Sequence, residues 1–318
     1  MRNKDEILGY VIWRKTNLYP WEIDSLDENF LDTAFKIAED IKNRMNDIEF
    51  FSLESENYPK LLSEIQRPPY GIFCKGDCGV LKGEMFSIVG TRKSSGYGES
   101  LARKFARELS KEFVIVSGMA YGIDSKAHEG AIESGYTIAA LASGVDVPSP
   151  KGNSSLYKKI LKKGCVISPY APGDEAKRYR FVERNSIIAG LSIGTLVIEA
   201  PKKSGSLITA SIAADFGRDV FAIPGDVGKY RSEGTNYLIK TGAMMVTDPS
   251  DILEYYGKNF EERKVSNPVY DLVKKGFGDP EEIADVLGIP IVDVLSELSE
   301  LEIDGFVQKG LDDIYRPL

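Results

Sequence analysis

The feature of this sequence that most limits its possible folds is a regular alternation, from residue 86 onward, of short apolar runs with amphipathic stretches of helical length. Strands that are apolar on both sides must be covered by helices on both faces, as in a doubly wound, mostly parallel sheet. We therefore predict an α/β fold with a Rossmann-like sheet, which binds ligands at the carboxyl ends of its strands. The expected strands are residues 86–90, 113–118, 136–143, 165–169, 195–200, 220–224 and 243–247.

The chain has 318 residues, which is more than one domain usually holds, so smaller units are expected on both sides of the sheet. Residues 1–56 are predicted to form a small helical N-terminal domain. Residues 57–255 form the extended Rossmann-like domain, and residues 251–266 form a charged linker. Residues 267–318 have the pattern of a winged-helix-like domain, with helices at 268–275, 280–287 and 291–303 and a final strand pair at 306–308 and 314–316.

Charge is distributed unevenly along the chain. The net charge of −8 at pH 7 disfavours a nucleic-acid ligand when the chain is taken as a whole. Residues 85–250, however, carry 22 basic and 16 acidic side chains, whereas residues 1–84 carry 11 and 16, and residues 251–318 carry 7 and 16. The predicted sheet domain is therefore basic between acidic ends, and we expect an anionic ligand to bind there.

The sequence predicts neither a membrane span nor a secretion signal. No apolar run is long enough to cross a bilayer, and the first 15 residues lack the apolar segment of a signal peptide. The three cysteines, Cys74, Cys78 and Cys165, fit a reducing compartment, so we expect a cytoplasmic protein. Because His128 is the only histidine, a four-ligand metal site would need carboxylates, and we predict no metal site and no cofactor.

Two loops at the expected carboxyl edge bring cations to the start of a helix. In the loop at residues 90–98, Arg92 and Lys93 lie among glycines and hydroxyls, and a helix N-terminus offers free N–H groups to an anion. The loop at residues 202–206 again combines lysines, hydroxyls and a glycine. The spacing matches neither the dinucleotide motif G-x-G-x-x-G nor the Walker lysine motif, so we predict contacts with phosphates rather than an NAD or ATP site.

Two other loops add different chemistry to the same edge. The loop at residues 117–124 ends at Asp124, a good helix N-cap, and leads to His128, for which a structural role is more frequent than a catalytic one. Residues 177–190 interleave arginines with Tyr179 and Phe181, which suits contact with the backbone and bases of a single strand. Four such loops predict a wide positive groove rather than a pocket for one nucleotide.

Several segments taken together resemble the DprA/Smf (DNA processing protein A) family. The segments are V-G-T-R-K-S-S-G-Y-G, S-G-M-A-Y-G-I-D-S-K-A-H, R-N-S-I-I-A-G-L-S, I-E-A-P-K-K-S-G-S-L-I-T-A, F-A-I-P-G and S-E-G-T-N-Y-L-I. Each is modest alone, but in this order, over roughly residues 57–248, they are specific. The C-terminal unit resembles the winged-helix domain frequent in that family, and the N-terminal helices occupy the position of its SAM-like domain.

The resemblance implies binding and protection of single-stranded DNA without sequence preference and without catalytic chemistry. It also implies loading of RecA recombinase during DNA uptake and natural transformation, and self-association as a homodimer. The residues expected to contact DNA or its phosphates are Gly90, Thr91, Arg92, Lys93, Ser117, Gly118, Gly122, Asp124, Lys151, Arg180, Phe181, Arg184, Asn185, Lys203, Ser204, Gly205 and Ser206.

The chain departs from the family pattern at two positions near this groove. The family usually has arginine where this chain has Tyr121 and Ser186, so two positive charges are absent. Lys93, Arg178 and Arg180 are expected to compensate for that loss.

Two other functions stay open at this point. Residues 194–199 resemble the G-T-x-x-E element of phosphoribohydrolases, which cleave nucleotides on a related fold. Their Pro-Gly-Gly lead-in is absent here, because Ser192 and Ile193 precede Gly194, and no acid/base pair with clear spacing is present. A protein-interaction scaffold is the third interpretation, and only the acidic ends of the chain support it.

The last predicted helix, residues 291–303, contains no lysine or arginine. Together with the residue that follows it, it carries five carboxylates, which would repel DNA from the helix that a winged-helix domain lays in the major groove. We therefore expect this unit to face a protein or to regulate, rather than to read DNA; the alternative is a small acidic domain that only packs on the rest of the chain. The carboxylates belong to Asp293, Glu297, Glu300, Glu302 and Asp304.

Overall fold

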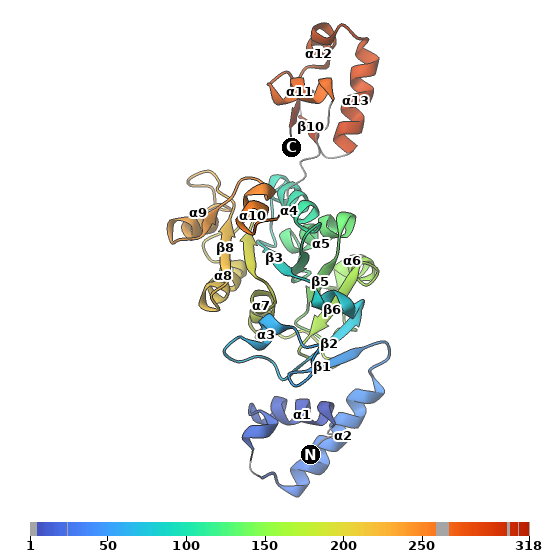
Figure 1. Ribbon diagram of the computed structural model, residues 1–318, viewed down its shortest axis with the longest axis vertical. Coiled ribbons are helices and arrows are strands. Elements are labelled where there is room, and N and C mark those ends of the chain that lie inside the picture. Colours follow the sequence, from blue (N-terminus) through green and yellow to red (C-terminus); the bar gives the residue numbers. More distant parts are fainter. Residues whose placement is uncertain (1–4, 24, 259–266, 304–305, 311, 318) are drawn as a thin grey trace. The chain divides into compact units, whose positions relative to one another are not determined.

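The computed structural model describes residues 5–23, 25–258, 267–303, 306–310 and 312–317, and it divides into two compact units, Met1–Lys258 and Asn259–Leu318. The first unit contains a nine-stranded sheet covered by helices (Figure 1). Its strands are β1 (Glu49–Ser52), β2 (Gly71–Gly76), β3 (Met85–Val89), β4 (Val114–Ser117), β5 (Thr137–Ala140), β6 (Gly164–Ser168), β7 (Gly194–Val197), β8 (Asp219–Ala222) and β9 (Met244–Met245).

The strand order is β1-β2-β6-β5-β4-β3-β7-β8-β9. All pairs from β6 to β9 are parallel, and β2 pairs antiparallel with both β1 and β6. From β3 the chain adds β4, β5 and β6 on one side, and it then returns to place β7 on the other side of β3. This confirms the predicted doubly wound, mostly parallel α/β fold and makes the β3–β7 pair its topological switch point. Every predicted apolar run overlaps one strand.

Helices connect the parallel strands and cover both faces of the sheet (Figure 1). Helices α4 and α5 pack on each other, as do α7 and α8, while α10 packs on α4. The helical segments of this unit are α1 (Glu6–Thr16), η1 (Pro20–Glu22), α2 (Glu28–Asn43), α3 (Lys60–Ser63), η2 (Cys78–Lys82), α4 (Gly96–Leu109), α5 (Ile123–Ser134), η3 (Lys151–Asn153), α6 (Ser154–Ile160), α7 (Arg180–Leu191), α8 (Gly205–Asp215), α9 (Glu233–Lys240) and α10 (Pro249–Tyr255).

The N-terminal residues are part of the sheet unit. Strand β1 lies within residues 1–56 yet pairs with β2, so the predicted boundary at residue 56 does not separate a purely helical domain from the sheet. Alternate residues of a strand face opposite sides, and on β2 Phe73 faces the core formed with α1 and α2. There Tyr10 packs edge-on against Phe73, at 5.1 Å between ring centroids, and its hydroxyl donates to the carbonyl oxygen of Pro169 at 3.0 Å.

The segment predicted as a charged linker is helical in its first part. Helix α10 extends to Tyr255, and Ile252 and Leu253 are buried against the sheet unit, because two apolar side chains among the charges are enough to anchor one short helix. The rest of that predicted linker, residues 259–266, lies outside the described residues.

The second unit has the predicted order of three helices and a strand pair. Its elements are α11 (Pro268–Lys274), α12 (Pro280–Leu287), α13 (Ile291–Ile303), β10 (Val307–Lys309) and β11 (Tyr315–Pro317). Val269, Ile283 and Leu298 are among the residues of its own apolar core. The assignment as a winged-helix domain stays a prediction, and Asp304 lies outside the described residues.

Two of the cysteines differ from the reduced thiols expected in a reducing compartment. Cys74 at the end of β2 and Cys78 in η2 form a disulfide, with their Cα atoms 6.2 Å apart, because the turn after β2 brings them together. Cys165 is free and buried. No group of three or more His, Cys, Asp or Glu side chains in the described part of the chain is arranged to hold a metal ion.

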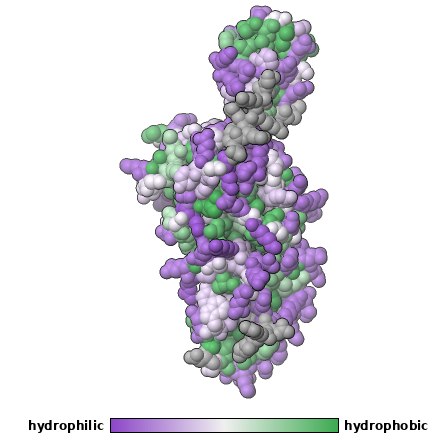
Figure 2. Space-filling view, in the orientation of Figure 1, coloured by the Kyte–Doolittle hydropathy of each residue, from purple (hydrophilic) through white to green (hydrophobic). Residues whose placement is uncertain are grey.

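The surface view in Figure 2 is largely hydrophilic, with apolar patches scattered among the polar side chains. Over the residues that the structure describes, we find no helix with the length and apolar character needed to cross a membrane.

Candidate nucleic-acid interface

The loops after β3 and β7 meet at the switch point and are joined through Glu199. Its carboxylate accepts hydrogen bonds from the backbone N–H of Ser95, at 2.9 Å, and from the hydroxyl of the same residue. Its carbonyl oxygen accepts the N–H of Thr91 at 2.8 Å. A Cβ atom on Gly98 would lie 2.4 Å from the carboxyl carbon of Glu199, so only glycine allows this approach. A carboxylate of the protein thus already occupies part of the anion site predicted at the start of α4.

Arg92 and Phe181 form the part of this edge best suited to a nucleotide. Arg92 is exposed, and its guanidinium carbon lies 5.1 Å from the ring centroid of the half-buried Phe181 at the start of α7. The guanidinium carbon of Arg184 lies 5.9 Å from the same ring. An aromatic ring beside a guanidinium offers a stacking surface for a base and a cation for a phosphate.

Arg184 lies beneath this surface rather than on it. It is 4% exposed, and its Nη1 donates to the carbonyl oxygen of Ala140 at 3.3 Å. A Cβ atom on Gly118 would lie 1.3 Å from the same Nη1, so Gly118 is needed for the guanidinium to pass. Asp124 is also buried, and burial raises the pKa of its carboxyl, while the charge of Arg184 acts in the opposite direction.

Arg180 is likewise turned inward. It is 6% exposed, its Nη2 lies 3.0 Å from a carboxylate oxygen of Asp174, and its guanidinium carbon lies 4.2 Å from the ring centroid of Tyr170. The compensating charge expected from Arg180 is therefore already paired. Arg178 is exposed and has no carboxylate partner among the described residues.

Other predicted residues shape the loops. Ser117 is fully buried and donates to the carbonyl oxygen of Ile88 at 2.7 Å. Gly122 has a φ of +76°, and a Cβ there would lie 2.5 Å from the carbonyl oxygen of Thr91, so these two loops touch. The hydroxyl of Thr91 accepts the N–H of Lys93 at 3.2 Å, which closes the turn after β3, directly beyond Gly90.

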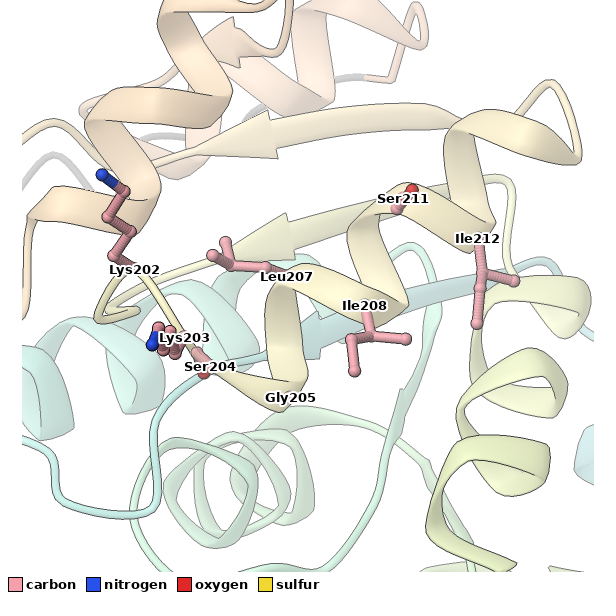
Figure 3. Close-up of a pocket in the computed structure, with 8 residues that line it drawn as sticks. All are labelled: Lys202, Lys203, Ser204, Gly205, Leu207, Ile208, Ser211 and Ile212. Atoms are coloured by element: carbon pink, nitrogen blue, oxygen red, sulfur yellow. The ribbon is translucent and has the colours of Figure 1, made fainter. Parts of the chain in front are cut away.

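The loop after β7 opens a shallow hollow at the start of α8. Figure 3 shows Lys202 and Lys203 beside this helix, with Ile208 and Ile212 projecting from it; the hollow holds about 500 Å³. Ser204 caps the helix by accepting the N–H of Ser206 at 3.3 Å, and the two hydroxyls lie 2.7 Å apart. Asn185 donates from its amide to the carbonyl oxygen of Gly205 at 3.4 Å, which links α7 to α8.

The exposed cations at this edge differ from those on the helices nearby. Arg103, Lys104 and Arg107 of α4 and Lys126 of α5 all pair with carboxylates. At the carboxyl edge, Lys229 pairs with Asp226, but seven other exposed cations have no carboxylate partner within the part of the chain that the structure describes. Unpaired cations attract a polyanion most strongly. These unpaired cations are Arg92, Lys93, Lys151, Lys177, Arg178, Lys202 and Lys203.

The two positions that depart from the family pattern lie in different places. Tyr121 is exposed beside η3, where a Cβ on Gly152 would lie 2.4 Å from its hydroxyl oxygen. Ser186 instead lines a hollow of about 240 Å³ together with Trp13 of α1 and Ile187 of α7. The charge absent at Ser186 therefore belongs to another part of the surface.

Sequence reasoning missed Arg231, which fixes one of these loops. Its Nε donates to the carbonyl oxygen of Lys93 at 2.6 Å, and its own carbonyl oxygen accepts the N–H of Ala200 at 2.8 Å. The loop after β8 is thereby held against both switch-point loops. The Arg231–Lys93 contact joins residues 138 positions apart, so no local pattern could have indicated it.

His128 has the structural role that the sequence favoured. It is fully buried, and burial, aided by the charge of Arg184, lowers the pKa of its imidazole to about 3. Glu199, the acidic residue of segment 194–199, lies one residue beyond the G-T-x-x-E spacing and is bonded within the switch-point loops as described above. The His128 imidazole and the Glu199 carboxylate thus both hold loops in place through hydrogen bonds.

Comparison with known proteins places this geometry in a family. The model of the DNA recombination-mediator protein A family matches residues 49–257. The chain is 41% identical to the DNA processing protein DprA of Streptococcus pneumoniae over 226 residues, which cover 70% of this chain and 80% of that protein. It is 36% identical to the protein Smf of Escherichia coli over 275 residues, covering 80% and 73% of the two chains.

Solved structures agree with this comparison. The X-ray structure of DprA from Streptococcus pneumoniae matches with a TM-score of 0.69 at 35% identity and covers 81% of this chain and 94% of that one. A structure of DNA processing protein A from Helicobacter pylori, described for that protein's single-stranded DNA binding mode, matches with a TM-score of 0.61 at 28% identity. It covers 67% of this chain and 97% of that one.

Proposed function

Because the chain belongs to the DNA recombination-mediator protein A family, also named DprA/Smf, we propose that it binds single-stranded DNA without sequence preference at the carboxyl edge of its sheet. The observation that carries this proposal is the exposed, unpaired Arg92 beside the ring of Phe181, at the switch point of the sheet. A cation for phosphate beside a ring for a base suits any sequence, since every base has an aromatic face.

The other unpaired cations extend this contact along the edge. Lys151 follows β5, Lys93 follows β3, and Lys202 and Lys203 follow β7, so phosphates of one strand have partners on several neighbouring loops. If about four phosphates are neutralised, log K should fall against log salt with a slope near −3. The buried Arg180, Arg184, Asp124 and Ser117 support these loops.

The test is a salt titration of oligonucleotide binding with two charge-removing variants. Arg92→Ala should weaken binding of all sequences by about 1–2 kcal/mol, the scale of a charge-assisted hydrogen bond. The matched control is Arg103→Ala, because Arg103 is also an exposed arginine but lies on α4 and pairs with Glu133. Unchanged affinity in Arg92→Ala, or a flat salt response of the unmodified protein, would refute the proposal.

Family membership supports four finer proposals. We propose that the protein protects the bound strand in the cytoplasm and loads RecA recombinase onto it during DNA uptake and natural transformation. We also propose that it self-associates as a homodimer and performs no catalysis. Sedimentation of the purified chain tests self-association, and the rate of RecA filament formation on protein-bound single strands tests loading.

A further inference from the structure

Three of the exposed tyrosines at the carboxyl edge lie on separate loops, after β3, β4 and β8. Tyr97 is 67% exposed in the first turn after the β3 loop, Tyr121 is 48% exposed after β4, and Tyr230 is 68% exposed after β8. None of the three hydroxyls has a hydrogen-bond partner in the described ranges of the chain. Single exposed aromatic residues need no explanation, but three along one basic edge do.

The backbone under each ring is held in place by neighbouring loops. Tyr230 precedes Arg231, whose bonds to Lys93 and Ala200 fix that loop against the switch point. Tyr121 lies between Met119, whose carbonyl oxygen accepts the amide of Asn153 at 2.8 Å, and the turn at Gly122.

Tyr97 is fixed in the same way. It follows Ser95, which Glu199 holds at the start of α4, and Gly98 on its other side lies against the same carboxylate. All three rings thus sit on ordered backbone, and an ordered, exposed aromatic side chain loses little entropy when a flat ligand stacks on it.

We propose that Tyr97, Tyr121 and Tyr230 are base-stacking residues that extend the single-strand contact from Phe181 across the switch point to β8. This inference rests on the proposed function and specifies the path of the DNA strand along the edge of the sheet. The occupant is single-stranded nucleic acid because a cation lies next to each ring in the sequence or the fold. Lys93 precedes Tyr97 in the same loop, Lys151 is next to the glycine against which Tyr121 lies, and Arg231, which bonds to the carbonyl oxygen of Lys93, follows Tyr230.

The order of the β-strands sets the length of this DNA path. The loops that follow β6, β5, β4, β3, β7 and β8 lie in that sequence along the edge, and neighbouring strands are about 4.8 Å apart. Five such steps span about 24 Å, which is the length of no more than about seven nucleotides at the roughly 3.4 Å per nucleotide of a stacked strand. One chain should therefore contact a short stretch of DNA with several bases stacked.

The experiment compares two probes, an oligothymidylate of about twelve nucleotides and an abasic oligonucleotide with the same number of phosphates. Each of Tyr97→Ala, Tyr121→Ala and Tyr230→Ala should lower the affinity for oligothymidylate about fivefold or more, the low end of what base stacking contributes. Affinity for the abasic probe should not change. Each Tyr→Phe variant should bind like the parent, because stacking needs the ring and not the hydroxyl.

Tyr136→Ala is the matched control, since Tyr136 is 51% exposed but precedes β5 at the opposite edge of the sheet. It should bind both probes normally. Equal losses on both probes, or no loss on oligothymidylate, would refute the stacking role. Arg92→Ala run in parallel separates the two proposals: if it weakens both probes while the tyrosine variants do not, the DNA site stands and only this inference fails.

Discussion

Acidification should destabilise the sheet unit through its single histidine. His128 Nδ1 lies 2.7 Å from the hydroxyl of Thr137, which itself donates to the carbonyl oxygen of Ile115 at 2.8 Å. The imidazole must therefore donate from Nδ1, and its Nε2 accepts the N–H of Met119 at 3.3 Å. Protonation would place a donor on Nε2 against the donor N–H of Met119 in a fully buried site, and this is why the folded protein holds the ring neutral.

The size of the effect follows from proton linkage. The pKa of His128 is lowered to about 3 in the folded chain and is about 6.5 in the unfolded chain. Because only the unfolded chain binds the proton between these two pKa values, stability is lost as the pH falls from about 6.5 toward about 3. At pH 5.0, about 1.5 units below the unfolded pKa, the loss is about 2 kcal/mol relative to pH 7.5. This figure depends on the unfolded pKa and is insensitive to a shift of one unit in the folded value.

Urea unfolding of the parent and of His128→Gln at pH 7.5 and 5.0 measures this loss. Tryptophan fluorescence isolates the sheet unit, because both tryptophans, Trp13 and Trp21, lie in it. The variant should be less stable than the parent at pH 7.5 but should lose about 2 kcal/mol less on acidification. Equal losses in the two proteins would show that His128 is not the group responsible.

Three further outcomes are expected. Gly118→Ala should displace Arg184 and destabilise the sheet unit by about 1–3 kcal/mol. Gly96→Ala is the control: a Cβ there meets no atom within 4 Å, so stability should change by less than about 1 kcal/mol. Similar urea midpoints for the two variants would contradict this. Nucleoside monophosphates should not be cleaved; release of free base that Glu199→Gln abolishes would establish the enzyme alternative. Deleting residues 267–318 should leave DNA affinity equal or higher, because α13 carries carboxylates and no cation; a large loss, with normal circular dichroism of the remainder, would show that this unit contacts DNA.

Local sequence patterns were sufficient to predict the order of the helices and strands and the edge of the sheet at which the candidate site lies. Apolar runs identify buried strands because a strand covered on both faces tolerates few polar side chains, and the seven predicted runs each overlap a strand from β3 to β9. The exposed Arg92, Lys93, Lys151 and Lys203 were also predictable, since loops after parallel strands meet at one edge whatever their side chains are.

Tertiary structure alone decided which polar residues face solvent at that edge. Arg178, Arg180 and Arg184 look alike in the sequence, but only Arg178 is exposed, because Asp174 and the space above Gly118 take in the other two. The sequence also carried no sign that Glu199 fills part of the α4 N-terminus or that β1 joins the sheet. A buried charge or a paired strand needs partners that folding brings in from distant positions in the chain. The periodicity of a single segment cannot predict those partners.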